Sequence, residues 1–274
     1  MKRMIGVCLA ALLLAAVCVG CGGSGKSGME LENGAEVLVG EGGIPVPAVV
    51  LPWLKEGQEL LLDDGKLLIV MLDEGRARVI RGGTLRGRKS IALPGADIYP
   101  PTLTEADLEN ISHAAEFGVT GLMQPFVHSG EELRKVRKAL QENGADHVKI
   151  FAKIENMQGV EHLEDILAEA DWVIIARGDL GNDMDLWQLP AVQKKIAAAC
   201  VKAGKPFVVV TQMLASMEHS PVPTRAEVSD IFNAVLDGCA GVMVTGETAV
   251  GDYPAEVIRY LTNTVKSAED YLQH

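Results

Sequence analysis

The sequence predicts an α/β protein in which parallel strand–helix units follow a small β-rich module. Three observations support this. Residues 35–97 form short apolar runs separated by turn signals. From Leu103 onward, apolar runs alternate with amphipathic stretches. Several of those stretches end at glycine, where a left-handed residue closes a helix at little cost. Strands and helices that alternate at this spacing are typical of parallel βα units.

The β-rich module contains a clear hairpin signal. An apolar run at Leu60–Leu62 leads into an Asp-Gly pair, and a second apolar run follows at Lys66–Met71. An Asp-Gly pair between apolar runs is a strong short-range signal for a β-hairpin. Ala77–Ile80 and the Gly82-Gly83 turn continue the pattern.

The second region predicts five strands and helices between them. A complete eight-stranded barrel takes about 250 residues, and only about 170 are available here, so we expect a partial TIM-type (β/α) barrel. The predicted strands are Gly121–Met123, Val148–Ala152, Trp172–Ala176, Pro206–Val210 and Gly241–Val244. The predicted helices include Glu131–Asn143, Val160–Ala170, Ala191–Ala203 and Arg225–Asp237, with terminal glycines at Gly144, Gly204 and Gly238.

The amino-terminal segment predicts export. Lys2 and Arg3 precede an apolar run to Val19, and Cys21 is followed by small residues, as in a bacterial lipoprotein signal. We therefore expect a leader at 1–21, a flexible tether at 22–34, the β-rich domain at 35–97 and the partial barrel at 98–274. The protein would be exported and membrane-anchored through the leader alone. An uncleaved anchor, or a cytoplasmic protein with a wrongly assigned start, is the alternative.

Net charge and cysteine content argue against two classes of protein, nucleic-acid binders and disulfide-stabilised domains. The net charge of −12 argues against non-specific nucleic-acid binding, which needs a basic surface. It does not exclude anionic substrates, because a bound divalent cation reverses the sign locally. Cys200 and Cys239 lie in apolar surroundings in the body of the chain, which favours two buried thiols over a disulfide framework.

Polar residues follow four of the five predicted strands. In a βα barrel, functional residues lie at the carboxyl ends of strands, so these residues would converge at one mouth. The four sets are Lys153 with Glu155, Arg177-Gly178-Asp179, Thr211-Gln212, and Thr245-Gly-Glu247.

These residue types fit phosphoryl or enolate chemistry. Lys153 and Glu155 are two positions apart, so on a strand they point to the same side. Glu155 and Asp179 could share a hard divalent ion, since Mg²⁺ takes a few carboxylates and completes its shell with substrate oxygens and waters. Lys153 would neutralise developing negative charge, and Gly178 would let a ligand approach the backbone. The alternative is a structural ion-pair network among Lys153, Glu155, Arg177 and Asp179.

Several motifs, in one collinear order, resemble the pyruvate kinase family. The barrel motifs are Lys149-Ile-Phe-Ala-Lys-Ile-Glu-Asn156, Ala176-Arg-Gly-Asp-Leu-Gly181, Gly204-Lys-Pro206, Thr211-Gln-Met-Leu214, Pro223-Thr-Arg-Ala-Glu227, Asn233-Ala-Val-Leu-Asp-Gly238, Gly246-Glu-Thr-Ala249 and Gly251-Asp-Tyr-Pro254. Upstream, Asp63-Asp-Gly65, Gly82-Gly-Thr-Leu85, Leu93-Pro-Gly95 and Leu103-Thr-Glu105 are similar to the lid domain of that family.

The resemblance implies a set of roles and ligands. Glu155 and Asp179 would hold Mg²⁺ or Mn²⁺, and Lys153 would lie beside the transferred phosphoryl group and the enolate oxygen. Gly178, Asp179 and Thr211 would surround the substrate carboxylate, with Thr211 near the face where the methylene carbon is protonated. Arg177, Thr245 and Glu247 would support these residues, and Lys89 would lie near the nucleotide. The ligands would be phosphoenolpyruvate or pyruvate and ADP or ATP.

The sequence also departs from the family pattern. Ser-Phe-Val-Arg of the family is Pro125-Phe-Val-His128 here, and Lys-Gly-Val-Asn of the lid is Lys89-Ser-Ile-Ala92. The resemblance covers barrel strands four to eight and part of the lid. The first three strands, with their phosphate arginine and potassium ligands, and the carboxyl-terminal regulatory domain are expected to be missing, so the K⁺ site would be lost.

These departures leave three functions open. The first is a pyruvate kinase-type phosphotransferase with impaired activity. The second is a Mg²⁺-dependent lyase or decarboxylase acting on oxaloacetate-like 2-oxo acids, and the third is a non-catalytic exported binding or scaffold protein. Because open sheet edges expose unpaired backbone groups, we also expect a homo-oligomer or a partner that supplies the remaining strands.

Overall fold

The computed structural model describes residues 28–63, 65–87, 89–96 and 101–274. They form two compact units, which divide between Pro101 and Thr102. The predicted leader and residues 22–27 of the predicted tether lie outside the described residues.

The first unit is built from antiparallel strands, as the turn signals predict. A five-stranded sheet has the order β2-β5-β4-β3-β7, and a separate pair joins β1 to β6. The predicted hairpin is present, with Leu62 opposite Leu67, although Asp64 of its turn is outside the described residues. The strands are β1 (Met29–Leu31), β2 (Glu36–Leu38), β3 (Glu59–Leu62), β4 (Leu67–Met71), β5 (Arg76–Arg81), β6 (Gly83–Leu85) and β7 (Ile91–Ala92), with a short 3₁₀ helix η1 (Leu51–Trp53).

The unit begins earlier than predicted. Met29–Leu31, which we expected to belong to a flexible tether, is strand β1 and pairs antiparallel with Gly83–Leu85. Leu31 is buried in the core of this unit. The prediction of a tether reaching residue 34 is therefore wrong at its end, because a three-residue strand carries too little alternation to be recognised without its partner.

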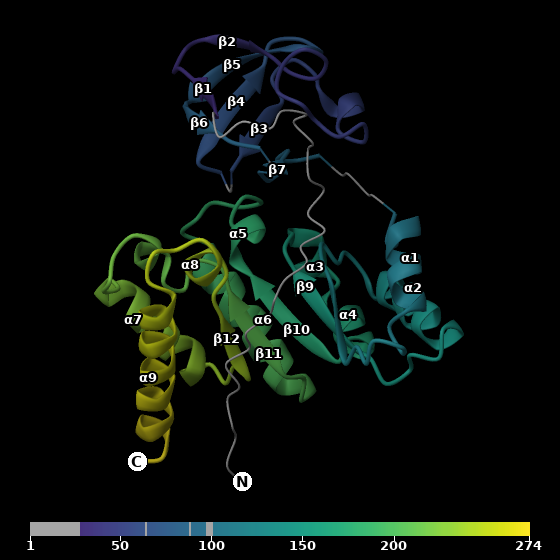
Figure 1. The fold of residues 1–274 in the computed structure, drawn as a ribbon, viewed down its shortest axis with the longest axis vertical. Coiled ribbons are helices and arrows are strands. Elements are labelled where there is room, and N and C mark those ends of the chain that lie inside the picture. The colour runs from purple at the N-terminus through teal and green to yellow at the C-terminus, as the bar shows by residue number, and fades with distance from the viewer. Residues whose placement is uncertain (1–27, 64, 88, 97–100) are drawn as a thin grey trace. The chain divides into compact units, whose positions relative to one another are not determined.

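The second unit contains one parallel sheet. Its strands follow chain order, β8-β9-β10-β11-β12, and every neighbouring pair is parallel. The five predicted strands are confirmed as β8 (Gly121–Gln124), β9 (Lys149–Ile154), β10 (Trp172–Ala176), β11 (Phe207–Val210) and β12 (Gly241–Met243). In Figure 1 these arrows lie side by side with helices packed along them. Within the described residues, β8 and β12 each have one partner strand, so the sheet is open at both ends.

Helices connect these strands. Three of the four predicted helices are present as single helices, and Gly144, Gly204 and Gly238 at their ends have φ of 67°, 65° and 87°. The helices are α1 (Glu105–Ser112), α2 (Gly130–Glu142), α3 (Met157–Glu161), α4 (Leu163–Glu169), α5 (Arg177–Leu180), α6 (Leu189–Ala203), α7 (Arg225–Leu236), α8 (Gly246–Ala249) and α9 (Pro254–Leu272), with a 3₁₀ helix η2 (Ala215–Glu218).

One predicted helix is two. The segment predicted as a single helix at 160–170 divides into α3 and α4 at His162, whose ψ of 20° departs from helical geometry. The helix also starts three residues early, because the Asn156 side chain accepts a hydrogen bond from the Gly159 N–H and caps the first turn.

The core of the second unit lies on both faces of the sheet. Val173–Ala176 and all of β11 are buried, which is the continuous apolar pattern of a parallel sheet covered by helices. Cys200 and Cys239 are buried free thiols, as predicted, and burial raises the pKa of each to about 12. None of the helices in the described ranges is long and apolar enough to cross a bilayer.

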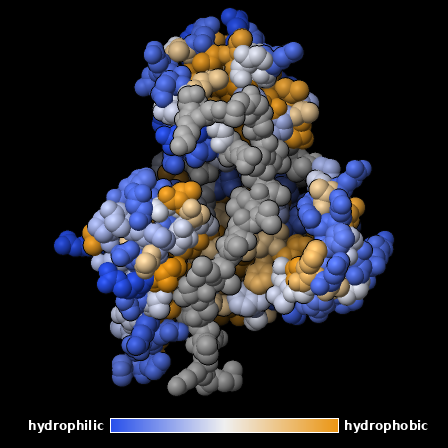
Figure 2. Space-filling view, viewed as in Figure 1, coloured by the Kyte–Doolittle hydropathy of each residue, from blue (hydrophilic) through white to orange (hydrophobic). Residues whose placement is uncertain are grey.

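Figure 2 shows hydrophilic side chains over much of the visible face of the second unit, with hydrophobic patches among them. Among the described residues of this unit, the large apolar side chains that are at least 70% exposed are Phe117, Leu186, Trp187 and Val250.

Candidate active site

The carboxyl ends of β9, β10 and β11 lie next to one another in register. Lys153 is opposite Ile174, and Ala176 is opposite Val210. The residues that follow these strands, including Glu155, Arg177 and Thr211, therefore leave the sheet at the same edge. This is the convergence that the sequence predicts for a barrel mouth.

Lys153 and Glu155 point to the same side of β9, as their two-residue spacing requires. Lys153 Nζ lies 2.5 Å from Glu155 Oε1, and the side chains are 16% and 2% exposed. The other oxygen, Glu155 Oε2, accepts a 2.8 Å hydrogen bond from the Phe126 N–H. A buried carboxylate is costly without such partners, so this pair is fixed by its surroundings.

Arg177 connects two strand ends. It is the first residue of α5, directly after β10, and its guanidinium reaches the turn after β11. Arg177 Nη2 donates to the Thr211 carbonyl at 2.7 Å, and Arg177 Nη1 donates to Asp230 Oδ2 at 2.6 Å. Asp179 lies two residues after Arg177, within the first turn of α5.

Gly178 and Thr211 approach each other closely. A Cβ at Gly178 would lie 3.0 Å from Thr211 Cγ2, closer than ordinary van der Waals contact. Thr211 and Gln212 have φ of 78° and 54°, a left-handed conformation that is unfavourable for a β-branched threonine. The structure therefore brings together two of the three residues expected around the substrate carboxylate.

Glu247 holds the neighbouring loop in place. It is 2% exposed and accepts hydrogen bonds from the Leu214 N–H at 3.2 Å and the Thr245 N–H at 2.8 Å. One buried carboxylate thus joins the segment after β11 to the segment after β12. The supporting role expected of Thr245 and Glu247 stays a prediction.

Lys89 belongs to the first unit. Its Nζ lies 2.8 Å from Asp63 Oδ1, and the Asp63 side chain is mostly buried. The expected contact between Lys89 and a nucleotide stays a prediction.

The donor set is compatible with magnesium. Among the described residues no group of three or more His, Cys, Asp or Glu side chains is arranged to hold a metal ion by itself. Mg²⁺ commonly takes one or two carboxylates and keeps waters and substrate oxygens for the rest of its shell. Glu155 and Asp179 follow neighbouring strands and carry carboxylate oxygens, the hard donors that Mg²⁺ prefers, and in this structure the Glu155 carboxylate is paired with the Lys153 ammonium.

The segment after β8 contains the departures at Pro125 and His128. Glu132 accepts a hydrogen bond from the His128 N–H at 2.7 Å, and the His128 ring Nδ1 lies 3.3 Å from Glu132 Oε1. Burial by itself raises the pKa of Glu132, but these hydrogen bonds outweigh it, and the pKa lies below the usual value. The His128 ring is therefore tied to α2.

Two residues of α7 were not predicted from the sequence. Asp230 pairs with Arg177, which is 53 positions away, and Glu227 binds Ser216 in η2. For Glu227 the Thr-x-x-Glu capping pattern was a usable signal, because Thr224 and Glu227 form a capping box. Nothing local in the sequence marks Asp230.

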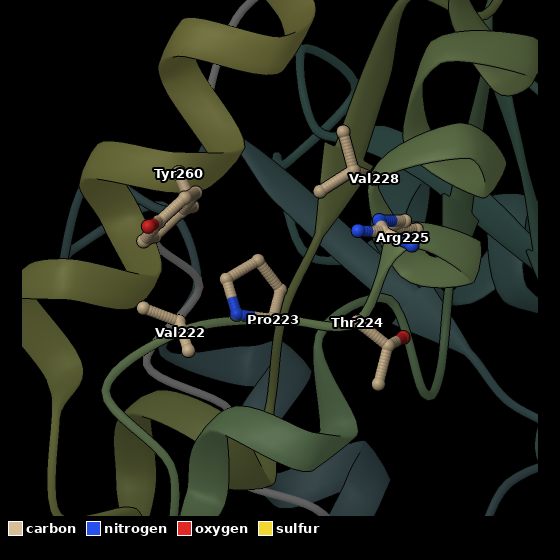
Figure 3. A pocket seen from close by; sticks show the side chains of 6 residues that line it. All are labelled: Val222, Pro223, Thr224, Arg225, Val228 and Tyr260. Carbon is tan, nitrogen blue, oxygen red and sulfur yellow. The ribbon is translucent and has the colours of Figure 1, made fainter.

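A separate shallow pocket of about 230 Å³ lies between the start of α7 and helix α9. Figure 3 shows Tyr260 on one side and Arg225 on the other. It is lined by Val222, Pro223, Thr224, Arg225, Val228 and Tyr260, so none of the predicted site residues borders it.

Comparison with known proteins agrees with the motifs. The family model described as the pyruvate kinase barrel domain matches residues 46–258. The chain is 41% identical over 221 residues to a pyruvate kinase of Debaryomyces hansenii, covering 79% of this chain and 44% of that protein. For pyruvate kinases of Agaricus bisporus and Bacillus licheniformis the identities are 43% and 37%, with 78% and 80% of this chain and 41% and 38% of theirs covered.

The chain thus spans less than half the length of these relatives. The match nevertheless includes the parallel sheet from β8 to β12 and every predicted site residue. The chain belongs to the pyruvate kinase family.

Proposed function

We propose that this chain performs pyruvate kinase-type chemistry, the Mg²⁺-dependent transfer of a phosphoryl group from phosphoenolpyruvate to ADP, giving pyruvate and ATP. The observation that carries the proposal is the alignment of Lys153, Glu155, Arg177 and Thr211 at the carboxyl ends of three adjacent parallel strands. The family membership supports the same reaction.

The reaction transfers the phosphoryl group and then protonates the enolate. The bond between phosphorus and the enol oxygen breaks as a bond to the terminal oxygen of ADP forms, and the enolate takes a proton at its methylene carbon. Such a transfer is catalysed mainly by positioning and charge stabilisation. The Lys153 ammonium would neutralise the enolate oxygen, and Thr211 would lie at the face that receives the proton.

Glu155, Asp179 and Gly178 would bind and orient the substrate. Glu155 and Asp179 would hold Mg²⁺, which when bound supplies positive charge to the substrate oxygens. The absence of a Cβ at Gly178 lets Thr211 approach closely, and the substrate carboxylate would lie beside these two residues. Lys89 would contact the nucleotide.

We also propose that the kinase activity is low. Pro125 and His128 stand where the family has the serine and arginine of its phosphate contact, and the His128 ring is tied to Glu132. Loss of a phosphate clamp weakens positioning, on which the transfer depends. A second candidate, metal-dependent decarboxylation of oxaloacetate-like acids, is favoured by the same observation, because it needs only the enolate site.

The direct test is a lactate dehydrogenase-coupled assay with phosphoenolpyruvate, ADP and Mg²⁺. Lys153→Met should lower the rate by about 10²–10³-fold, because a charge that stabilises the enolate is removed. Lys149→Met is the matched control. Lys149 is at the opposite end of the same strand and is 60% exposed beside Asp171, so its replacement should leave the rate unchanged.

The alternatives give different outcomes. Oxaloacetate consumption that needs Mg²⁺ but no ADP, and that Lys153→Met abolishes, would support the decarboxylase. If neither reaction occurs and calorimetry detects no heat with Mg²⁺ and oxalate, the enzymatic proposal is wrong and a binding or scaffold role remains.

Export is a separate proposal. Its support is the basic, apolar and small-residue pattern of residues 1–21, with Cys21 as the acceptor of a lipid. Mass spectrometry of the native amino terminus should find a lipid-modified Cys21. An unprocessed Met1 in a soluble fraction would contradict it and favour the cytoplasmic alternative.

A further inference from the structure

We propose that Asp230 is a positioning residue for the substrate site. It fixes the guanidinium of Arg177, and Arg177 in turn holds the backbone of Thr211. The proposal rests on the proposed function to the extent that Thr211 lies beside the substrate. Its structural part can be tested without that assumption.

The turn after β11 has a strained backbone that contacts from other segments must stabilise. Thr211 and Gln212 are consecutive left-handed residues, and neither is glycine. Residues with a Cβ are strained in such conformations, which persist only where the surrounding structure enforces them. Thr211 in this conformation places its Cγ2 3.0 Å from the point where a Cβ of Gly178 would lie.

Arg177 makes some of these stabilising contacts. Its Nη2 donates to the Thr211 carbonyl at 2.7 Å, and its Nε donates to the Val210 carbonyl at 3.3 Å. Two donors of one planar group therefore fix two consecutive peptide planes at the end of β11. The Arg177 side chain is only 12% exposed, so its charge needs a nearby partner.

Asp230 provides that partner from a different element. Its Oδ2 lies 2.6 Å from Arg177 Nη1, a short charge-assisted hydrogen bond. Gln193 Oε1 accepts from the same nitrogen at 3.4 Å, which is a longer and neutral contact. Asp230 thus determines where the guanidinium lies, while it is separated from Thr211 by the arginine itself.

The chain offers a matched control on the same helix. Asp237, just after the last residue of α7, makes a comparable ion pair with Lys194, at 2.6 Å. Asp237→Asn removes a similar charge pair without touching Arg177. Any effect of Asp230→Asn that Asp237→Asn does not share belongs to the position of Asp230.

The experiment compares Asp230→Asn, Asp230→Glu and Asp237→Asn in the full-length protein by hydrogen exchange and calorimetry. Asp230→Asn should speed amide hydrogen exchange in the segment Val210–Leu214. It should also weaken binding of oxalate with Mg²⁺ about tenfold, which is the lower end of the range for residues that orient the ligand-binding residues. Asp230→Glu should restore part of both. In an Arg177→Lys background, Asp230→Asn should have a much smaller effect.

Two results would overturn the inference. One is equal exchange in Val210–Leu214 for Asp230→Asn and Asp237→Asn. The other is a general increase in exchange across the second unit, which indicates loss of stability alone. If the parent protein does not bind oxalate, the proposed function fails, while the exchange comparison still decides whether Asp230 positions the turn.

Discussion

At the scale of single residues, the site depends on glycine where a side chain would be too large and on threonine where the backbone is unfavourable. Gly178 has an ordinary backbone conformation, so its missing side chain matters for space and not for φ. Gly144 is the opposite case, with a φ of 67° and open space around its Cα. Glycine is needed at Gly178 for its small volume and at Gly144 for its positive φ.

Gly178→Ala should weaken binding of oxalate with Mg²⁺ by about tenfold or more, because the new Cβ pushes against Thr211 Cγ2 and displaces the substrate site. Its free energy of unfolding should change by less than about 1 kcal/mol, since alanine suits a helix. Titration calorimetry and urea denaturation measure the two quantities.

Gly144→Ala is the contrasting variant. It should lower the free energy of unfolding by about 1 kcal/mol, because alanine is strained at positive φ, and leave oxalate binding unchanged. If both variants lose stability and neither loses affinity, Gly178 has no role in ligand approach.

At the scale of elements, helix α7 braces the segment that follows β11. Glu227 and Asp230 are three positions apart and share one face of α7. Glu227 accepts hydrogen bonds from the Ser216 N–H at 2.7 Å and the Ser216 hydroxyl at 2.6 Å. Asp230 acts on Thr211 through Arg177. Helix α7 therefore stabilises the segment from Thr211 to Ser216 at both of its ends.

The hydrogen bonds that Glu227 accepts predict that the stability of the protein depends on pH. Burial raises the pKa of Glu227, but the hydrogen bonds from Ser216 and Thr224 together outweigh it, so the folded-state pKa lies below the ordinary 4.5. The contribution is therefore complete above pH 4.5 and is lost as the pH falls through the folded-state pKa.

Glu227→Gln should consequently lower the melting temperature at pH 7 and reduce the further loss between pH 5 and pH 3. Differential scanning fluorimetry across that range measures both. Glu109→Gln, at an exposed position of α1, is the control and should leave the profile of the parent. A parallel downward shift of the Glu227→Gln profile at every pH would argue against the linkage.

The same contacts show how far the sequence alone leads. The five parallel strands and the converging polar residues could be predicted, because apolar periodicity and the position after a strand are local signals. Strand β1 and the break at His162 could not, since each depends on a contact with a distant segment. The pairing of Asp230 with Arg177 is of the second kind.

At the scale of the whole molecule, the described sheet has two open edges, at β8 and β12. Open edges expose unpaired backbone groups and invite pairing with another strand. The side chains of Leu186 and Trp187 are 70% and 78% exposed and add apolar surface that is unfavourable to leave in contact with water. Both features favour association of the chain with further strands, from a second copy or from another protein.

We therefore predict that the purified protein is oligomeric. Light scattering should give a molar mass of at least twice that of the chain, and the melting temperature should rise with protein concentration, because association stabilises the folded state by mass action. A second protein that co-purifies in fixed stoichiometry would satisfy the same requirement. A monodisperse monomer whose melting temperature is independent of concentration would mean that the edges are covered from within the chain, and the prediction would be wrong.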